Sequence, residues 1–145
     1  MKNSRRTFVK KAIAGATIAS VGGMLPGISA KSYGRILGAN ERINAASMGV
    51  VSRGHAVGTN FASQDDCEVI YSCDVDSRAA EKFAGSVNEI QGRRPKIEKD
   101  IRKVLEDKEV DALIVTAPDH WHAPAAILGL KAGKHVYVEK PCAHN

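Results

Sequence analysis

The chain has 145 residues, of which 43% are hydrophobic and 26% charged, a composition typical of a folded globular protein and not of a disordered one. This length suits one domain with a hydrophobic core and is too short for two ordinary domains. The formal charge of +5 comes from residues 1–30, which hold five basic residues and no acidic ones, whereas the remainder holds 16 of each. Because no basic surface is left over, nucleic-acid binding is not expected.

Residues 1–30 have the features of an export signal. A basic start that includes Arg5 and Arg6 precedes a Gly- and Ala-rich, mildly apolar stretch and a small-residue cleavage site at 28–30. The adjacent arginines resemble a twin-arginine signal, which exports proteins already folded around a cofactor. We therefore expect the export machinery as a partner and a periplasmic or otherwise exported location, with residues 31–42 as an arm or linker. The alternative, an N-terminal helix of the domain, is disfavoured by the glycines and the proline within this stretch.

From residue 43 to 145, short apolar runs alternate with amphipathic stretches. Strands are predicted over residues 43–50, 67–73, near 97, 110–118 and 135–141. Helices are predicted over residues 54–64, 76–90, 100–108 and 121–133. Apolar strands separated by helices indicate a parallel sheet that is covered on both faces, so the predicted fold class is α/β with a doubly wound sheet.

The first strand and helix enclose a partial dinucleotide-binding fingerprint. Gly49 and Gly54 occupy the first and third glycine positions, but the second is Val51, whose β-branched side chain would crowd a phosphate group. Ser52 and Arg53 are predicted to compensate as phosphate donors at the helix N-terminus. The alternative is an ordinary strand-to-helix turn. The first strand is also weak, because Ser47 interrupts its apolar run at the centre of the sheet.

The second strand is followed directly by Asp74. An acid at this place hydrogen-bonds the ribose hydroxyls of an adenosine and repels a 2′-phosphate, so it favours NAD over NADP. Asp76 directly precedes the next helix and is predicted to be its N-cap. Arg78 leaves NADP as the less favoured alternative.

Residues 116–122 (TAPDHWH) follow the most apolar strand. Ligands of open α/β sheets bind beyond the carboxyl ends of the strands. Ala117, Pro118, His120 and Trp121 are therefore predicted to line a cofactor- and substrate-facing loop. The spacing of histidines and aspartate in this segment is weak for a metal, and no metal site is predicted.

The three cysteines are predicted to be buried free thiols. Cys67 and Cys73 stand at the two ends of one apolar run, so on a strand they are too far apart to form a disulfide. The odd number of cysteines also gives no disulfide framework.

The last strand delivers Glu139, Lys140 and Pro141 to the ligand edge of the sheet. An ammonium group there can bind a substrate hydroxyl or assist proton transfer. Strand alternation would place Glu139 on the opposite face, where it serves structure and not chemistry. The alternative for Glu139 and Lys140 is an exposed pair of charges that contributes little.

Three segments resemble the N-terminal half of the glucose–fructose oxidoreductase / inositol dehydrogenase / rhizopine-catabolism (Gfo/Idh/MocA) family. They are GVVSRG, CDVDSRA and the long run from VDALIVTAPDHWH to HVYVEKP, in this order and spacing. The resemblance covers about residues 41–145 and implies a Rossmann domain that binds NAD(P), with Lys140 as the catalytic residue and a Lys140–Pro141 bond that is commonly cis. The implied cofactor-binding set is Gly49, Ser52, Arg53, Gly54, Asp74, Ala117, Pro118, His120, Trp121, Glu139 and Lys140.

The resemblance also implies a second, C-terminal α/β domain that supplies the Asp/His pair for the substrate proton. On this basis the chain is expected to be truncated before the last crossover of its sheet and to supply the cofactor half of an exported oxidoreductase. The implied reaction is hydride transfer between a sugar or cyclitol hydroxyl and nicotinamide. The sequence leaves undecided whether the protein forms a homo-oligomer. Two alternatives remain, namely an NAD-dependent glycosidase that works by oxidation and elimination and a non-catalytic nucleotide-binding fragment.

Overall fold

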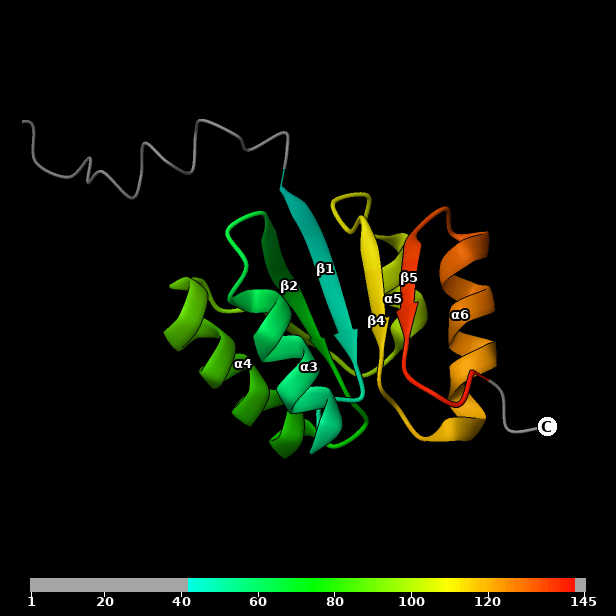
Figure 1. Ribbon diagram of the computed structural model, residues 1–145, viewed down its shortest axis with the longest axis horizontal. Helices are drawn as coiled ribbons and strands as arrows, with labels where there is room; N and C mark the ends of the chain where they lie inside the picture. Colours follow the sequence, from blue (N-terminus) through cyan, green and yellow to red (C-terminus); the bar gives the residue numbers. More distant parts are fainter. Residues whose placement is uncertain (1–41, 143–145) are drawn as a thin grey trace, which may run out of the picture. The chain divides into compact units, whose positions relative to one another are not determined.

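The computed structural model describes residues 42–142, so the predicted export signal, with Arg5 and Arg6, lies outside the described residues (Figure 1). The described part forms one parallel sheet in the strand order β3-β2-β1-β4-β5. Its strands are β1 (Ile43–Met48), β2 (Cys67–Cys73), β3 (Lys96–Glu98), β4 (Ala112–Val115) and β5 (His135–Val138). The predicted α/β class with a doubly wound parallel sheet is confirmed.

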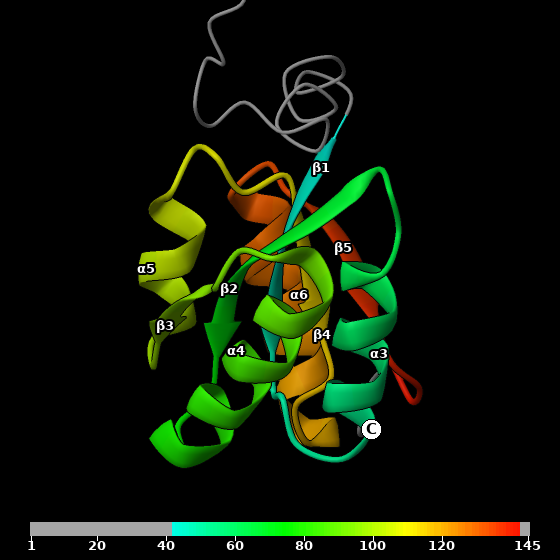
Figure 2. The same ribbon diagram turned by 90° about the vertical axis from the view of Figure 1, so that its left-hand side faces the viewer.

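Helices cover both faces of this sheet. They are α3 (Arg53–Ala62), α4 (Ser77–Gln91), α5 (Ile101–Glu106) and α6 (His122–Lys131), with a short 3-10 helix η2 (Asp119–Trp121) before α6. Helices α3 and α4 lie on one face, and α5 and α6 on the other (Figures 1 and 2). None of the helices in the described range is long and apolar enough to span a membrane.

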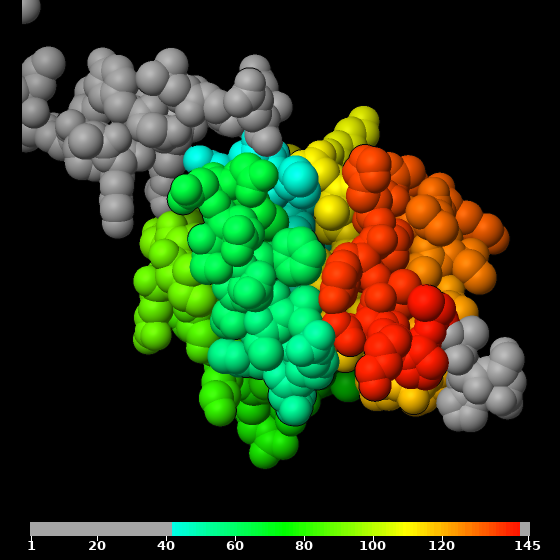
Figure 3. Space-filling view, in the orientation of Figure 1, coloured from blue at the N-terminus to red at the C-terminus, as the bar shows by residue number. Residues whose placement is uncertain are grey.

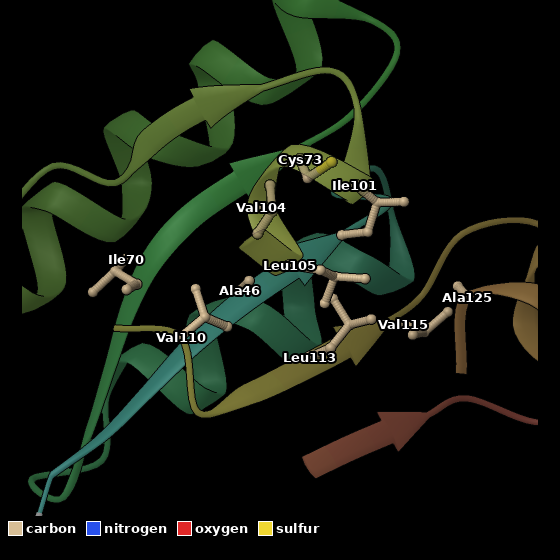
Figure 4. Packing of buried hydrophobic residues seen from close by; sticks show 10 residues of the cluster. All are labelled: Ala46, Ile70, Cys73, Ile101, Val104, Leu105, Val110, Leu113, Val115 and Ala125. Atoms are coloured by element: carbon tan, nitrogen blue, oxygen red, sulfur yellow. The ribbon is translucent and has the colours of Figure 1, made fainter. Parts of the chain in front are cut away.

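The core therefore consists of two apolar layers, one on each face of the sheet. The layer beneath α5 and α6 is drawn in Figure 4. It combines residues of the sheet with both helices: Ala46, Ile70, Cys73, Ile101, Val104, Leu105, Val110, Leu113, Val115 and Ala125. The layer beneath α3 and α4 is centred on Phe83, whose side chain is fully buried.

The small size of Ser47 in β1 is explained by the close approach of α3. A Cβ atom on Gly58 would lie 2.5 Å from the Phe83 ring and 3.1 Å from the Ser47 hydroxyl oxygen, so neither the helix nor the central strand has room for larger groups. Ser47 is fully buried, and its hydroxyl has no hydrogen-bond partner among residues 42–142. The weak strand signal thus reflects tight helix–strand packing.

Both strands that lead to the ligand edge are shorter than predicted. β4 ends at Val115, and β5 ends at Val138, because the hydrogen-bond ladder stops soon after these residues. The backbone N–H of Glu139 still donates to the carbonyl of Val115 at 3.0 Å. Glu139 and Lys140 therefore belong to a loop, and strand alternation no longer determines which way their side chains face.

Candidate functional site

The turn after β1 packs against the loop after β4. Gly49 has φ +80°, and a Cβ atom there would lie 2.5 Å from the backbone of Ala117. A Cβ atom on Gly54 would lie 1.7 Å from the carbonyl oxygen of Gly49. Both predicted glycine positions therefore have a steric reason, since any side chain would separate β1 from α3 or from the neighbouring loop.

The start of α3 presents backbone donors that are not used inside the domain. The N–H groups of Val51 and Ser52 have no hydrogen-bond partner in the described part of the chain. Ser52 is the N-cap of α3 and has φ 49°, a conformation that is strained for a residue with a side chain, and it makes no side-chain cap. Val51, at the middle-glycine position, is 60% exposed. Unpaired amides at a helix N-terminus are suited to bind a phosphate group.

Asp74 connects the end of β2 to two turns. Its Oδ2 accepts the backbone N–H of Val50 at 2.9 Å, and its Oδ1 accepts the backbone N–H of Asp76 at 2.9 Å. A carboxylate has about four lone-pair positions, so both oxygens can still accept a hydroxyl. The carboxylate thus holds the glycine turn and retains acceptor capacity toward a ligand.

Asp76 is confirmed as the N-cap of α4. It accepts the backbone N–H of Arg78 at 2.9 Å, and the Arg78 guanidinium binds the same carboxylate at 3.0 Å. The hydrogen bonds from the side chain and the backbone of Arg78 lower the pKa of Asp76. Asp74 and Asp76 therefore have separate structural roles, and the Arg78 guanidinium is paired.

A cavity of about 800 Å³ lies at the carboxyl ends of the strands. Its lining includes several of the residues predicted from the sequence: Gly49, Asp74, Ala117, Pro118, His120 and Trp121. The remaining lining residues were not predicted from the sequence: Met48, Cys73, Val75, Lys99, Asp100, Ile101, Arg102 and Leu128. Most of the missed residues follow β2 or β3, and the rule that loops after parallel strands meet at one edge was the signal that could have identified them.

Arg53 and Glu139 form an ion pair outside this cavity. Arg53 Nη2 donates to Glu139 Oε1 at 2.9 Å, and the hydroxyl of Tyr137 donates to the same oxygen at 2.8 Å. These two hydrogen bonds lower the pKa of Glu139. Arg53 and Tyr137 also line a second hollow of about 480 Å³ between α3 and β5, which lie next to each other on the face seen in Figure 3. The Arg53 guanidinium, predicted as a phosphate donor, is thus engaged by Glu139.

Lys140 lies between two residues that are held by distant parts of the chain. Its side chain is exposed, and its ammonium group makes no hydrogen bond or ion pair within residues 42–142. The Lys140–Pro141 bond is cis, as the family resemblance implied. The ring of His122, only 2% exposed, approaches the carbonyl oxygen of Pro141 with Nδ1 at 2.6 Å. His122 belongs to the segment singled out in the sequence but had been given no role.

Cys67 and Cys73 are free and buried, as predicted, whereas Cys142 is free but exposed. Burial, with smaller contributions from nearby carboxylates, raises the pKa of Cys67 to about 11 and that of Cys73 to about 12. Both thiols are therefore protonated at neutral pH. Residues 42–142 contain no cluster of three or more side chains suited to hold a metal ion.

The fold defines a Rossmann-type domain with a cavity at the carboxyl edge of its sheet. Residues 40–145 match the family model described as "Oxidoreductase family, NAD-binding Rossmann fold" (GFO_IDH_MocA). The chain belongs to this family.

Curated relatives include glycosidases. The chain is 28% identical to a glycosyl hydrolase family 109 protein of Saccharopolyspora erythraea, over 95% of this chain and 33% of the relative. It is 28% identical to an alpha-N-acetylgalactosaminidase of Shewanella oneidensis, over 71% of this chain and 23% of the relative. The chain thus spans about a third or less of the length of these relatives.

A solved NAD-binding protein from Listeria innocua has a similar structure. It is 30% identical with a TM-score of 0.61, and the match covers 71% of this chain and 28% of the other. This similarity supports the assignment of this chain to an NAD-binding Rossmann-type domain.

Proposed function

We propose that residues 43–145 form the NAD-binding domain of an oxidoreductase that acts on a sugar or cyclitol hydroxyl, with Lys140 as the group that meets the substrate. The observation that carries the proposal is the contact of Gly49 with Ala117, where a Cβ atom would lie 2.5 Å from backbone atoms at the border of the cavity. Such close packing leaves the backbone of the glycine turn accessible to a pyrophosphate.

The residues around the cavity fit a dinucleotide. The unpaired N–H groups of Val51 and Ser52 would hold phosphate oxygens, and the Asp74 carboxylate would accept ribose hydroxyls. Because Asp74 also repels a 2′-phosphate, NAD is favoured over NADP. The apolar side chains of Val75 and Ile101 in the cavity lining give a planar base a surface to pack on.

Bound NAD would supply an acceptor for the hydride that leaves the carbinol carbon. The role of Lys140 is to hydrogen-bond the reacting hydroxyl oxygen through Nζ and to favour loss of its proton while negative charge develops there. An ammonium group without an internal partner is suited to this role, since it need not break an ion pair to bind substrate. Under this proposal, a group of the second domain that the family resemblance implies would finally take the proton.

A glycosidase is the second candidate, because curated relatives carry that name. In that case the same domain would oxidise the sugar transiently, and the cofactor would return to its starting state after elimination of the aglycone. The two candidates share the cavity and Lys140 and differ in net products. A third, non-catalytic binding module, would bind NAD without any turnover.

Calorimetric titration of the chain with NAD and NADP tests the binding proposal. We expect one site per chain and tighter binding of NAD, and absence of binding for both cofactors would refute the proposal. In the protein with its downstream sequence, release of NADH from a free sugar identifies the oxidoreductase. Cleavage of an aryl alpha-N-acetylgalactosaminide without net NADH identifies the glycosidase.

We also propose that the protein is exported from the cytoplasm. The Arg5-Arg6 pair and the small-residue cleavage site support export along the twin-arginine route. Export in the folded state suits a protein that acquires its dinucleotide in the cytoplasm.

A further inference from the structure

We infer that Arg53 and His122 are positioning residues that hold the loop segment 139–141 from both sides and thereby fix Lys140. This inference rests on the proposed function, since it takes Lys140 to be the group that meets the substrate. It assigns to Arg53 a role different from phosphate binding, and it gives a role to His122, which the proposed function does not use.

The Lys140 side chain makes no hydrogen bond or ion pair within residues 42–142 that could define its position. Lys140 follows the end of β5 at Val138, and its side chain is exposed. A flexible four-carbon side chain on an unrestrained loop samples many orientations. Precise placement of the ammonium therefore depends on what holds its two neighbours.

The first neighbour, Glu139, is fixed through backbone and side chain. Its N–H donates to the carbonyl of Val115 at 3.0 Å, and its Oε1 receives Arg53 at 2.9 Å and Tyr137 at 2.8 Å. The Glu139 side chain is only 11% exposed, although that of Arg53 is 67% exposed.

The second neighbour, Pro141, is fixed by a buried ring. A carbonyl oxygen only accepts, so the 2.6 Å contact requires the proton of His122 to be on Nδ1. With 2% exposure, the His122 ring has no bulk water to replace this partner. A buried ring that loses its acceptor is costly, and the bond is therefore well suited to define the position of the loop.

The two anchors stand at the helix starts that directly follow the two loops bordering the cavity. Arg53 is the first residue of α3, directly after the glycine turn, and His122 is the first residue of α6, directly after Trp121 in the cavity lining. These loops are themselves packed together by Gly49 and Ala117. The position of Lys140 is thus set by the same segments that would hold the dinucleotide.

Hydrogen exchange of the Glu139 amide, which donates to the carbonyl of Val115, followed by NMR on the chain, tests this inference. The variants are Arg53→Met, His122→Ala and His122→Asn, in which the asparagine NH₂ reaches about as far as Nδ1 and can donate to Pro141. Arg93→Met is the matched control, because Arg93 pairs with Glu68 at 2.9 Å with side-chain exposures of 59% and 10%, close to those of the Arg53–Glu139 pair.

We expect exchange at the Glu139 amide to accelerate by about tenfold or more in Arg53→Met and His122→Ala, and to stay within about threefold of the parent in His122→Asn and Arg93→Met. Unchanged exchange in folded Arg53→Met would overturn the inference. Equal acceleration in Arg93→Met would also overturn it, because it would show that loss of any comparable ion pair destabilises the whole domain. If His122→Ala does not fold, unchanged exchange in Arg53→Met still decides against it.

A second measurement separates positioning from binding. In the protein with its downstream sequence, Arg53→Met should lower kcat by about tenfold or more and change the NAD affinity by less than about threefold. Weakened NAD binding with unchanged amide exchange would assign Arg53 to the phosphate and overturn the inference. If the parent chain does not bind NAD, the proposed function fails, whereas the exchange measurement still reports on the two anchors.

Discussion

Gly49 and Ala117 approach so closely that a Cβ atom on the glycine would lie 2.5 Å from the nitrogen and Cα of Ala117. The turn after β1 and the loop after β4 are therefore packed backbone against backbone. We predict that Gly49→Ala destabilises the domain by about 2–4 kcal/mol, the sum of left-handed strain and an overlap that only backbone movement can relieve. Urea unfolding measures the loss, and NAD binding should disappear with it.

Gly133→Ala is the matched control for this substitution. Gly133 has φ +73°, close to that of Gly49, but a Cβ atom there would meet nothing within 4 Å. Its replacement by alanine should lower the free energy of unfolding only by the strain of a left-handed backbone, about 1–2 kcal/mol. NAD binding should stay intact. Equal costs at the two positions would show that the contact with Ala117 does not matter.

Asp74 should determine cofactor preference and also support the glycine turn. We predict that Asp74→Ala weakens NAD binding by about 1.5–3 kcal/mol, because a charged hydrogen bond to the ribose is lost. The difference in affinity between NAD and NADP should also become smaller, because the repulsion of a 2′-phosphate is lost. The loss of its bond to Val50 should lower stability as well. Calorimetry with both cofactors measures the first effect.

The control for Asp74 is Asp76→Ala, which removes the cap of α4 but no ribose acceptor. It should cost about 1 kcal/mol of stability and leave the ratio of NAD to NADP affinity unchanged. A parent chain that binds NADP as tightly as NAD would contradict the assignment of Asp74.

Much of the fold could be predicted from the sequence because the order of its elements depends on local patterns. Apolar runs and helical periodicity predict the order of strands and helices, and the position of Asp76 before an amphipathic stretch predicts a cap. The weak β1 signal was harder to interpret, since the small size of Ser47 is explained only by the approach of Gly58 from α3.

The parts that could not be predicted depend on contacts between distant segments. Where β5 ends is decided by its neighbour β4, so Glu139 was assigned to a strand although it lies in a loop. The pairing of Arg53 with Glu139 joins residues 86 positions apart, and no local pattern indicates it. The same holds for His122 and the carbonyl of Pro141.

The two buried thiols make stability depend on alkaline pH. Burial raises the pKa of Cys67 to about 11 and of Cys73 to about 12, whereas the thiol pKa in an unfolded chain is about 8.5. Above that value the unfolded state loses thiol protons before the folded state does, so the free energy of unfolding should fall as pH rises toward 11. Each thiol contributes at most about 1.4 kcal/mol per pH unit.

Urea unfolding at pH 8, 9 and 10 measures this dependence. The double variant Cys67→Ala with Cys73→Ala should have a flatter slope, whatever its absolute stability. An identical slope in parent and double variant would exclude the thiols as its cause. Exposed Cys142 is the internal reference for alkylation, since it should react in the folded chain at pH 8 while the other two stay protected.

Export should require both arginines of the leader. Replacing Arg5 and Arg6 together with lysine should leave the precursor in the cytoplasm, because the twin-arginine route recognises guanidinium groups and not charge alone. Cell fractionation measures the distribution, and a single replacement at Lys2 is the control. Normal export of the double-lysine variant would argue against this route.

Lys140 should carry the chemistry, and its neighbour Glu139 should affect it only through position. In the protein with its downstream sequence, Lys140→Ala should lower kcat by about 10²–10⁴, as expected for loss of a positioned acid–base group. NAD affinity should change little, because the amides of the glycine turn and Asp74 are retained. Glu139→Gln keeps an acceptor for Arg53 and Tyr137, so its effect on kcat should be much smaller. Steady-state kinetics and calorimetry on the same preparations measure both quantities. Near-normal turnover of Lys140→Ala, or a larger loss in Glu139→Gln than in Lys140→Ala, would remove Lys140 from the reaction and leave the loop with a structural role alone.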